Sequence, residues 1–60
     1  MKPKELLKIL EADGWRIERV RGSHYIMKHP IKPGMPVIPM HNTDLKLGTY
    51  SNILKQAGLK

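Results

Sequence analysis

The side chain best suited to chemistry in this chain is His24, within the segment Arg21-Gly22-Ser23-His24-Tyr25. Histidine can both accept and donate a proton near neutral pH. Gly22 and Ser23 predict a tight turn that presents His24 at the start of a strand. Arg21 adds a positive charge beside the imidazole. A proton-transfer group among cations favours a small ribonuclease over a passive RNA-binding protein.

RNA cleavage needs few protein groups because the ribose 2′-hydroxyl is itself the nucleophile. A base must remove the 2′ proton, a cation must stabilise the phosphoryl charge, and an acid must protonate the leaving oxygen. His24 is our candidate for the base, and Lys28 or Arg21 for the cation. The acid stays open between His24 itself, a water molecule and His41.

Other chemistries have little support. The chain has no cysteine, which removes disulfides, thiolate metal sites and thiol nucleophiles. The three histidines have few carboxylates with which to form a metal site, so we expect no metal and no cofactor. Ser23 lacks a visible base to activate it, and we expect it to shape the turn, with a supporting contact to phosphate.

The positive charge lies in one part of the sequence. The chain has 11 Lys and Arg against five Asp and Glu, a net charge of +6. The two signs balance up to Asp13, and the excess falls after it. This distribution favours a phosphate backbone as partner, although a merely soluble basic surface is the alternative. The RNA-binding candidates are Arg19, Arg21, Lys28 and Lys46.

Length and hydropathy predict the class of protein. Residues 1–60 are enough for one domain, and a chain this short buries only about 60% of its unfolded surface. We therefore expect a single two-layer core without a deep cavity. No apolar run approaches the roughly 20 residues of a membrane span. Together with the absence of cysteine, this predicts a cytoplasmic protein without a membrane partner.

The first half of the chain predicts a helix and two strands. Pro3 suits a first helical turn, and Gly14 a helix end. Residues 15–18 alternate between apolar and polar side chains, as a strand does. The alternation fails at Arg19-Val20, so either Val20 faces the other side or a bulge interrupts the strand. A second strand is expected over 24–29.

The second half predicts an edge strand and a closing helix. Pro36 and Pro39 restrict residues 35–40 to the edge of a sheet. Residues 42–44 are predicted to cap a single helical turn over 45–47, and Thr49 to be the N-cap of a final helix. The order α-β-β-β-α predicts an α+β fold, with two helices on one face of a three-stranded antiparallel sheet. Trp15, Met27 and Ile38 are the expected centre of the core.

The sequence resembles the HicA toxins, which are small bacterial mRNA interferases with a double-stranded-RNA-binding-domain-like fold. Shared segments run from the first helix to the last one, in the same order and spacing. They are 14–15, 19–24, 29–30, 38–41, 44–46, 48–49 and 53–59. The resemblance implies an endoribonuclease that cleaves mRNA, with His24 catalytic, held inactive by a HicB-type antitoxin.

A non-catalytic RNA-binding module with the same fold is the alternative. A double-stranded-RNA binder contacts about 16 base pairs and usually carries lysines at the start of its last helix. Residues 48–52 carry no charge here, which counts against that function.

Overall fold

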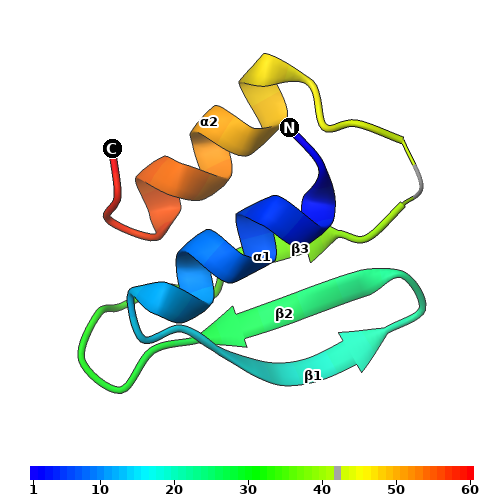
Figure 1. Ribbon diagram of the computed structural model, residues 1–60. Helices are drawn as coiled ribbons and strands as arrows, with labels where there is room; N and C mark the ends of the chain where they lie inside the picture. The colour runs from blue at the N-terminus through cyan, green and yellow to red at the C-terminus, as the bar shows by residue number, and fades with distance from the viewer. Residues whose placement is uncertain (42) are drawn as a thin grey trace.

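The computed structural model describes residues 1–41 and 43–60. Two helices and three strands follow in the predicted order α-β-β-β-α, which confirms the α+β fold class (Figure 1). The strands form one antiparallel sheet in the order β1-β2-β3, so β3 is an edge strand, as its prolines predict. No helix among the described residues is long and apolar enough to cross a membrane. The elements are α1 (Pro3–Ala12), β1 (Arg16–Arg21), β2 (His24–Lys28), β3 (Val37–Pro39) and α2 (Leu47–Gln56).

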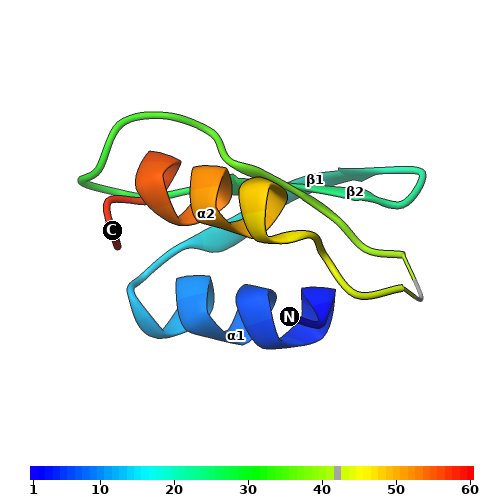
Figure 2. The same cartoon turned by 90° about the horizontal axis from the view of Figure 1, so that it is seen from above.

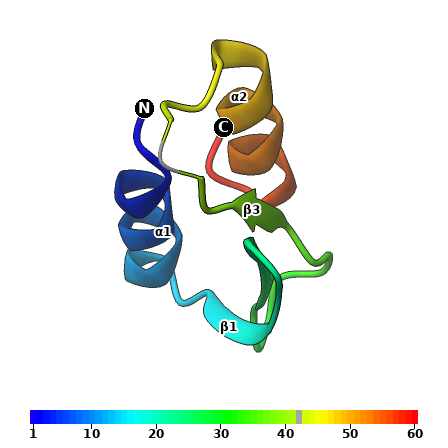
Figure 3. The ribbon, with the colours of Figure 1, turned by 90° about the vertical axis from the view of Figure 1, so that its right-hand side faces the viewer.

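The helices take different positions against the sheet. Figure 2 shows α1 as a separate layer that covers one face of the strands. The end-on view of Figure 3 shows α2 alongside β3, at the edge of the sheet farthest from β1. Within the described residues no helix covers the opposite face of the sheet, and α2 borders it along the β3 edge.

The core has Trp15 near its centre, as predicted. Trp15, Met27 and Ile38 are fully buried in one cluster. The helices add apolar side chains at helical spacing, and the indole N–H of Trp15 donates to the carbonyl oxygen of Ala57 at 3.3 Å. That hydrogen bond joins the start of the sheet to the end of α2. The helical members of the cluster are Leu6 and Leu10 of α1, together with Ile53 and Ala57.

Both helices end at a glycine in the left-handed region of φ. Gly14 has φ 105°, and the N–H of Trp15 donates to the carbonyl of Leu10. Gly58 has φ 72°, and the N–H of Leu59 donates to the carbonyl of Leu54. This 6→1 bond is the Schellman motif, which satisfies carbonyls that the helix leaves unpaired.

A β-bulge interrupts β1, which is one of the two possibilities that the sequence left open at Val20. The pairing of β1 with β2 shifts between Ile17 and Arg19, so that Glu18 is the extra residue. Ile17 pairs with Met27, and Val20 pairs with Tyr25, which packs against the core. The bulge therefore keeps the apolar side chains of β1 on the helix-covered face on both sides of Glu18.

The boundaries in the second half differ from the prediction. β3 covers Val37–Pro39 only, and α2 begins at Leu47 with Lys46 as its N-cap. No helical turn forms over 45–47, because the N–H of Leu45 donates to the carbonyl of Met1 at 2.7 Å and holds this segment extended. Thr49 is therefore not the N-cap but lies in the first turn of α2. Of the predicted capping residues, Asn42 lies outside the described residues.

The β2–β3 loop is fastened to the C-terminal ends of both helices. The Lys32 Nζ atom lies 2.5 Å from the Asp13 Oδ2 atom, at the end of α1, and 3.3 Å from the Ala57 carbonyl oxygen, at the end of α2. Both side chains of the ion pair are about a third exposed or less. Lys32 therefore serves the fold and is not among the cations free for a ligand.

Gly14→Ala and Gly48→Ala should change stability in opposite directions. At Gly14 a Cβ would lie 2.7 Å from His29 Nε2, on a backbone with φ 105°. The strain and the clash should lower the free energy of unfolding by about 2 kcal/mol or more. Gly48 has no neighbour within 4 Å of its Cβ position and lies in the first turn of α2. Alanine there should raise the free energy of unfolding by up to about 1 kcal/mol. Urea unfolding of both variants checks this, and equal effects would contradict it.

Asp13→Asn should make the protein less sensitive to acid. The hydrogen bond from Lys32 holds the pKa of Asp13 below its ordinary value of 3.8. The ion pair therefore contributes to stability above that value, and its contribution is lost as the pH falls through the lowered pKa. Melting temperatures measured from about pH 6 to about pH 2 should fall less for the variant than for the wild type. Parallel curves would show that the ion pair adds no pH-dependent stability.

Candidate active site

A two-residue hairpin presents His24 at the first position of β2. Gly22 has φ 60° and no other residue in the turn has a positive φ, as in a type II′ turn with glycine at its first central position. His24 pairs with Arg21 of β1 on one side and with Pro39 of β3 on the other. It is exposed and makes no hydrogen bond to another described side chain. The imidazole is therefore free to meet a ligand.

His41 lies beside His24. The N–H of Met40 donates to the carbonyl of Ser23 at 2.7 Å, which continues the pairing of β3 past Pro39. The next residue, His41, then stands against the start of β2. The two imidazole centroids are 6.1 Å apart, with the rings at 81° to each other. At this separation both rings can approach one phosphodiester group.

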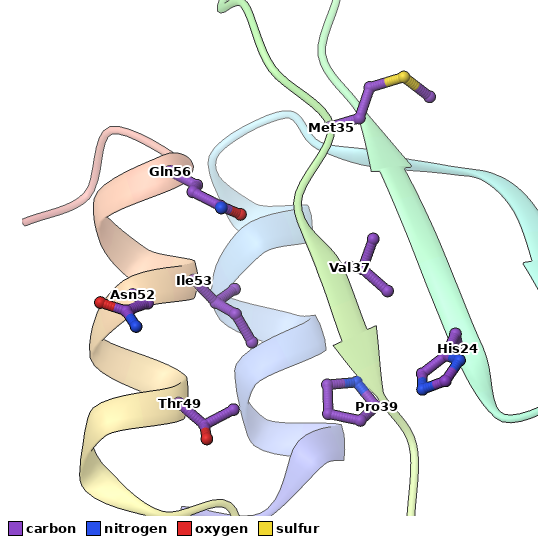
Figure 4. Close-up of a pocket in the computed structure, with 8 residues that line it drawn as sticks. All are labelled: His24, Met35, Val37, Pro39, Thr49, Asn52, Ile53 and Gln56. Atoms are coloured by element: carbon purple, nitrogen blue, oxygen red, sulfur yellow. The ribbon is translucent and has the colours of Figure 1, made fainter.

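Two surface grooves meet at His24. One groove, of about 440 Å³, lies between β3 and α2 and is lined by both elements (Figure 4). The other, of about 490 Å³, is lined by Arg21, His24, Ile26 and Val37 and crosses the uncovered face of the sheet. His24 and Val37 line both grooves. A chain-like ligand could therefore pass His24 with contacts on either side.

The predicted cations lie at different distances from His24. Arg21 is its direct partner across the hairpin, and Arg19 is paired with Ile26 two residues further along. Lys28 ends the same strand, four residues from His24, which is about 13 Å of extended chain. Lys46 caps α2 and lines neither groove. Arg21 is therefore the cation nearest to the candidate base, whereas Lys28 and Lys46 lie away from it.

The ion pairs of the described residues leave these cations free. They join Lys2 with Asp44, at 3.4 Å, and Lys32 with Asp13. Arg19, Arg21 and Lys28 belong to neither, so they can face phosphates. By contrast, the Arg16 guanidinium, opposite Lys28, donates to the carbonyl oxygens of Glu11 and Trp15.

The other sequence candidates have distinct positions. Ser23 lies in the turn, half-buried, and its carbonyl is the group that holds Met40. Ser23 directly precedes His24, and its hydroxyl makes no hydrogen bond to a described residue. Within 1–41 and 43–60, no three side chains of His, Asp or Glu gather as metal ligands would.

His29 is a structural residue. Its Nδ1 atom accepts the N–H groups of Ile31 and Lys32, each at 3.0 Å. Its Nε2 atom, which must then carry the proton, donates to the carbonyl of Asp13 at 2.8 Å. The ring also packs edge-on against Trp15, with centroids 5.1 Å apart. The imidazole thus joins the β2–β3 loop to the end of α1.

The residues of α2 that border the groove were not among the residues predicted from the sequence. Thr49, Asn52 and Gln56 line it together with Ile53, opposite Met35 and Val37. Their spacing in the sequence could have identified them, because residues 49, 52 and 56 follow the i, i+3, i+7 spacing of one helix face. Their position beside His24, however, depends on how α2 packs against β3.

Comparison with protein families gives a match over nearly the whole chain. A family model described as the HicA toxin of bacterial toxin–antitoxin systems matches residues 3–59 of the 60-residue chain. The match covers both helices, all three strands, and the neighbouring His24 and His41. A search of curated proteins finds no match.

His29→Ala and His24→Ala should differ in stability. Removing His29 leaves two backbone N–H groups and one carbonyl without their partner, which should cost about 1–3 kcal/mol. His24 is exposed and makes no such bonds, so its loss should change the free energy of unfolding by less than about 0.5 kcal/mol. Thermal unfolding followed by circular dichroism measures both. Equal losses would mean that His24 has a structural role.

Proposed function

The chain belongs to the HicA toxin family of bacterial toxin–antitoxin systems, and on that basis we propose that it is an endoribonuclease that cleaves mRNA. His24 is the catalytic residue in this proposal, and the nucleophile is the ribose 2′-hydroxyl of the substrate. A HicB-type antitoxin neutralises the toxin by covering the same surface.

The observation that carries the proposal is the free imidazole of His24 where two grooves meet. Catalytic side chains are commonly exposed residues held by a rigid turn, and His24 is fixed by hairpin and strand pairing on both sides. His41 lies within 6.1 Å of it, centroid to centroid, and Arg21 is its cross-strand partner. A base, a cation and a second proton-transfer group are thus available to one phosphodiester.

The proposed reaction assigns one role to each group. His24 removes the proton of the 2′-hydroxyl, whose oxygen attacks the adjacent phosphorus, and the bond to the 5′ oxygen breaks. Arg21 stabilises the negative charge that grows on the phosphoryl oxygens. His41, when protonated, gives its proton to the leaving 5′ oxygen. The products are a 2′,3′-cyclic phosphate and a 5′-hydroxyl, and no metal or cofactor takes part.

RNA affinity comes mainly from the cations in this proposal. Arg19, Arg21 and Lys28 lie on β1 and β2, two of the three strands of the uncovered face, and Lys46 adds charge at the start of α2. Each phosphate contact releases counterions, so binding should weaken as salt rises. An antitoxin that presents acidic side chains to Arg21 and Lys28 would compete for the same charges and associate faster at low salt.

His24→Ala should abolish cleavage of an mRNA transcript in excess chelator, with a loss of about 100-fold or more. Binding of the RNA should persist, since the cations that supply affinity remain. His41→Ala should give a smaller loss and remove one limb of the pH–rate profile, because two proton transfers shape that profile. The measurement is the cleavage rate per folded molecule, with analysis of the product ends.

His29→Ala is the control, since its rate per folded molecule should stay near that of the wild type. An RNA with 2′-deoxyribose at the cleaved position should resist the enzyme. Loss of activity in chelator would contradict the metal-independent mechanism. If His24→Ala retains most of the activity, the catalytic assignment is wrong. If the wild type binds RNA without cleaving it, the non-catalytic RNA-binding module is the better description.

A further inference from the structure

The groove between β3 and α2 differs in chemistry from the rest of the candidate site. Its lining contains no Lys, Arg, Asp or Glu among the described residues, although the chain has a net charge of +6. His24 stands at one end of it (Figure 4), and the cations Arg19, Arg21 and Lys28 belong to β1 and β2 and are not part of its lining. The cationic side chains that could bind a phosphate therefore lie outside the lining of this groove. The groove suits an uncharged part of the substrate.

The floor of the groove is apolar. Val37 of β3 and Ile53 of α2 both line it, and Met35 extends the floor toward the preceding loop. Val37 and Met35 are 39% and 48% exposed, which leaves open apolar surface beside the candidate base. Aliphatic side chains can pack against the flat face of a nucleobase. A methionine sulfur also makes favourable contacts with aromatic rings.

The α2 side of the groove carries hydrogen-bonding groups without charge. Asn52 and Gln56 are one helical turn apart, and Thr49 lies one turn before Asn52. All three side chains are exposed and make no hydrogen bond to another described residue. A side-chain amide offers a donor and an acceptor together, the pattern that pairs with the edge of a base.

We propose that this groove is a base-binding subsite, which holds one unpaired nucleobase next to the phosphodiester at His24 and sets the sequence preference of cleavage. The base lies on Val37 and Met35, and the amides of Asn52 and Gln56 bond to its edge. The inference rests on the proposed function, because it takes the substrate to be RNA.

The geometry favours a single-stranded substrate. A base inside a duplex presents only its groove edge, whereas a base in this groove exposes one face and one edge to the protein. Sequence-specific proteins read RNA in this way at single-stranded positions, where bases can be turned out of the stack. The small volume of about 440 Å³ and the shallow, surface position of the groove suit one base.

The decisive experiment compares cleavage at every position of a randomised single-stranded RNA. Asn52→Ala and Gln56→Ala should flatten the base preference at one position beside the cut, by about fivefold or more. The overall rate on the best wild-type sequence should fall by a similar factor. Both substitutions introduce a better helix former, so α2 should remain intact.

Lys55→Ala is the matched control on the same helix. Lys55 is exposed and does not line the groove. Loss of its charge should weaken binding of all sequences alike and reduce the salt dependence, with the base preference unchanged. An unchanged preference in Asn52→Ala and Gln56→Ala would overturn the subsite. If these two variants keep the base preference but bind the antitoxin more weakly, the groove is a docking site for a protein instead.

A binding measurement separates failure of the subsite from failure of the nuclease proposal. Oligonucleotides made of 2′-deoxyribose, which lack the nucleophile, are compared with versions that carry one abasic position. One abasic position should weaken binding to the wild type at least about threefold more than binding to the doubly substituted N52A/Q56A protein. This result supports the subsite even if no RNA is cleaved. An equal loss in both proteins overturns it, whether or not the wild type is a nuclease.

Discussion

The hydrogen bond and burial of Trp15 determine where α2 lies, and the candidate site depends on that position. A 60-residue chain can bury only a small apolar core, and Ile53 is the buried residue of its second helix, with Ala57 buried just after the helix end. The indole fills the centre of the core and donates to the Ala57 carbonyl, which Lys32 also contacts. These contacts fix the C-terminal end of α2 beside β3. Without them α2, which forms the wall of the groove next to His24, would lose both side-chain hydrogen bonds to its C-terminal end.

On the other side of the site, the bulge at Glu18 determines which face of the sheet the side chains of β1 occupy. Strict alternation along β1 would place Ile17 and Val20 on opposite faces. One extra residue returns Val20 to the face of Tyr25 while Arg19 and Arg21 pair with Ile26 and His24. The same six-residue strand, exposed along its whole length, can thus turn its apolar side chains to the helix-covered face and its cations to the uncovered face. The single bulge at Glu18 thus serves both the pairing of the sheet and the placement of positive charge at the candidate site.

Local signals account for what could be predicted from the sequence. Gly14 and Gly58 stop their helices, and Gly22 makes the hairpin, since only glycine adopts these φ values without strain. The order of elements and the burial of Trp15, Met27 and Ile38 followed from apolar patterns. The start of α2 did not, because Leu45 is held by a bond to Met1, which is distant in sequence. The approach of His41 to His24 likewise depends on the bond from Met40 to Ser23 between strands. The groove of Thr49, Asn52 and Gln56 exists only once α2 has packed.

The small size of the protein also explains why its candidate site is open. A core of this size cannot enclose a substrate, so the imidazole and the cations are displayed on a surface instead of being buried in a cleft. In the part of the chain that the structure describes, such a site is open to a long polymer, and no element covers His24. A partner that occupied this surface would control access to it. A partner that covers His24 would meet Arg21 on one side and the uncharged groove on the other. Charge on that partner would speed its association, and apolar or amide groups fitted to the groove would slow its release.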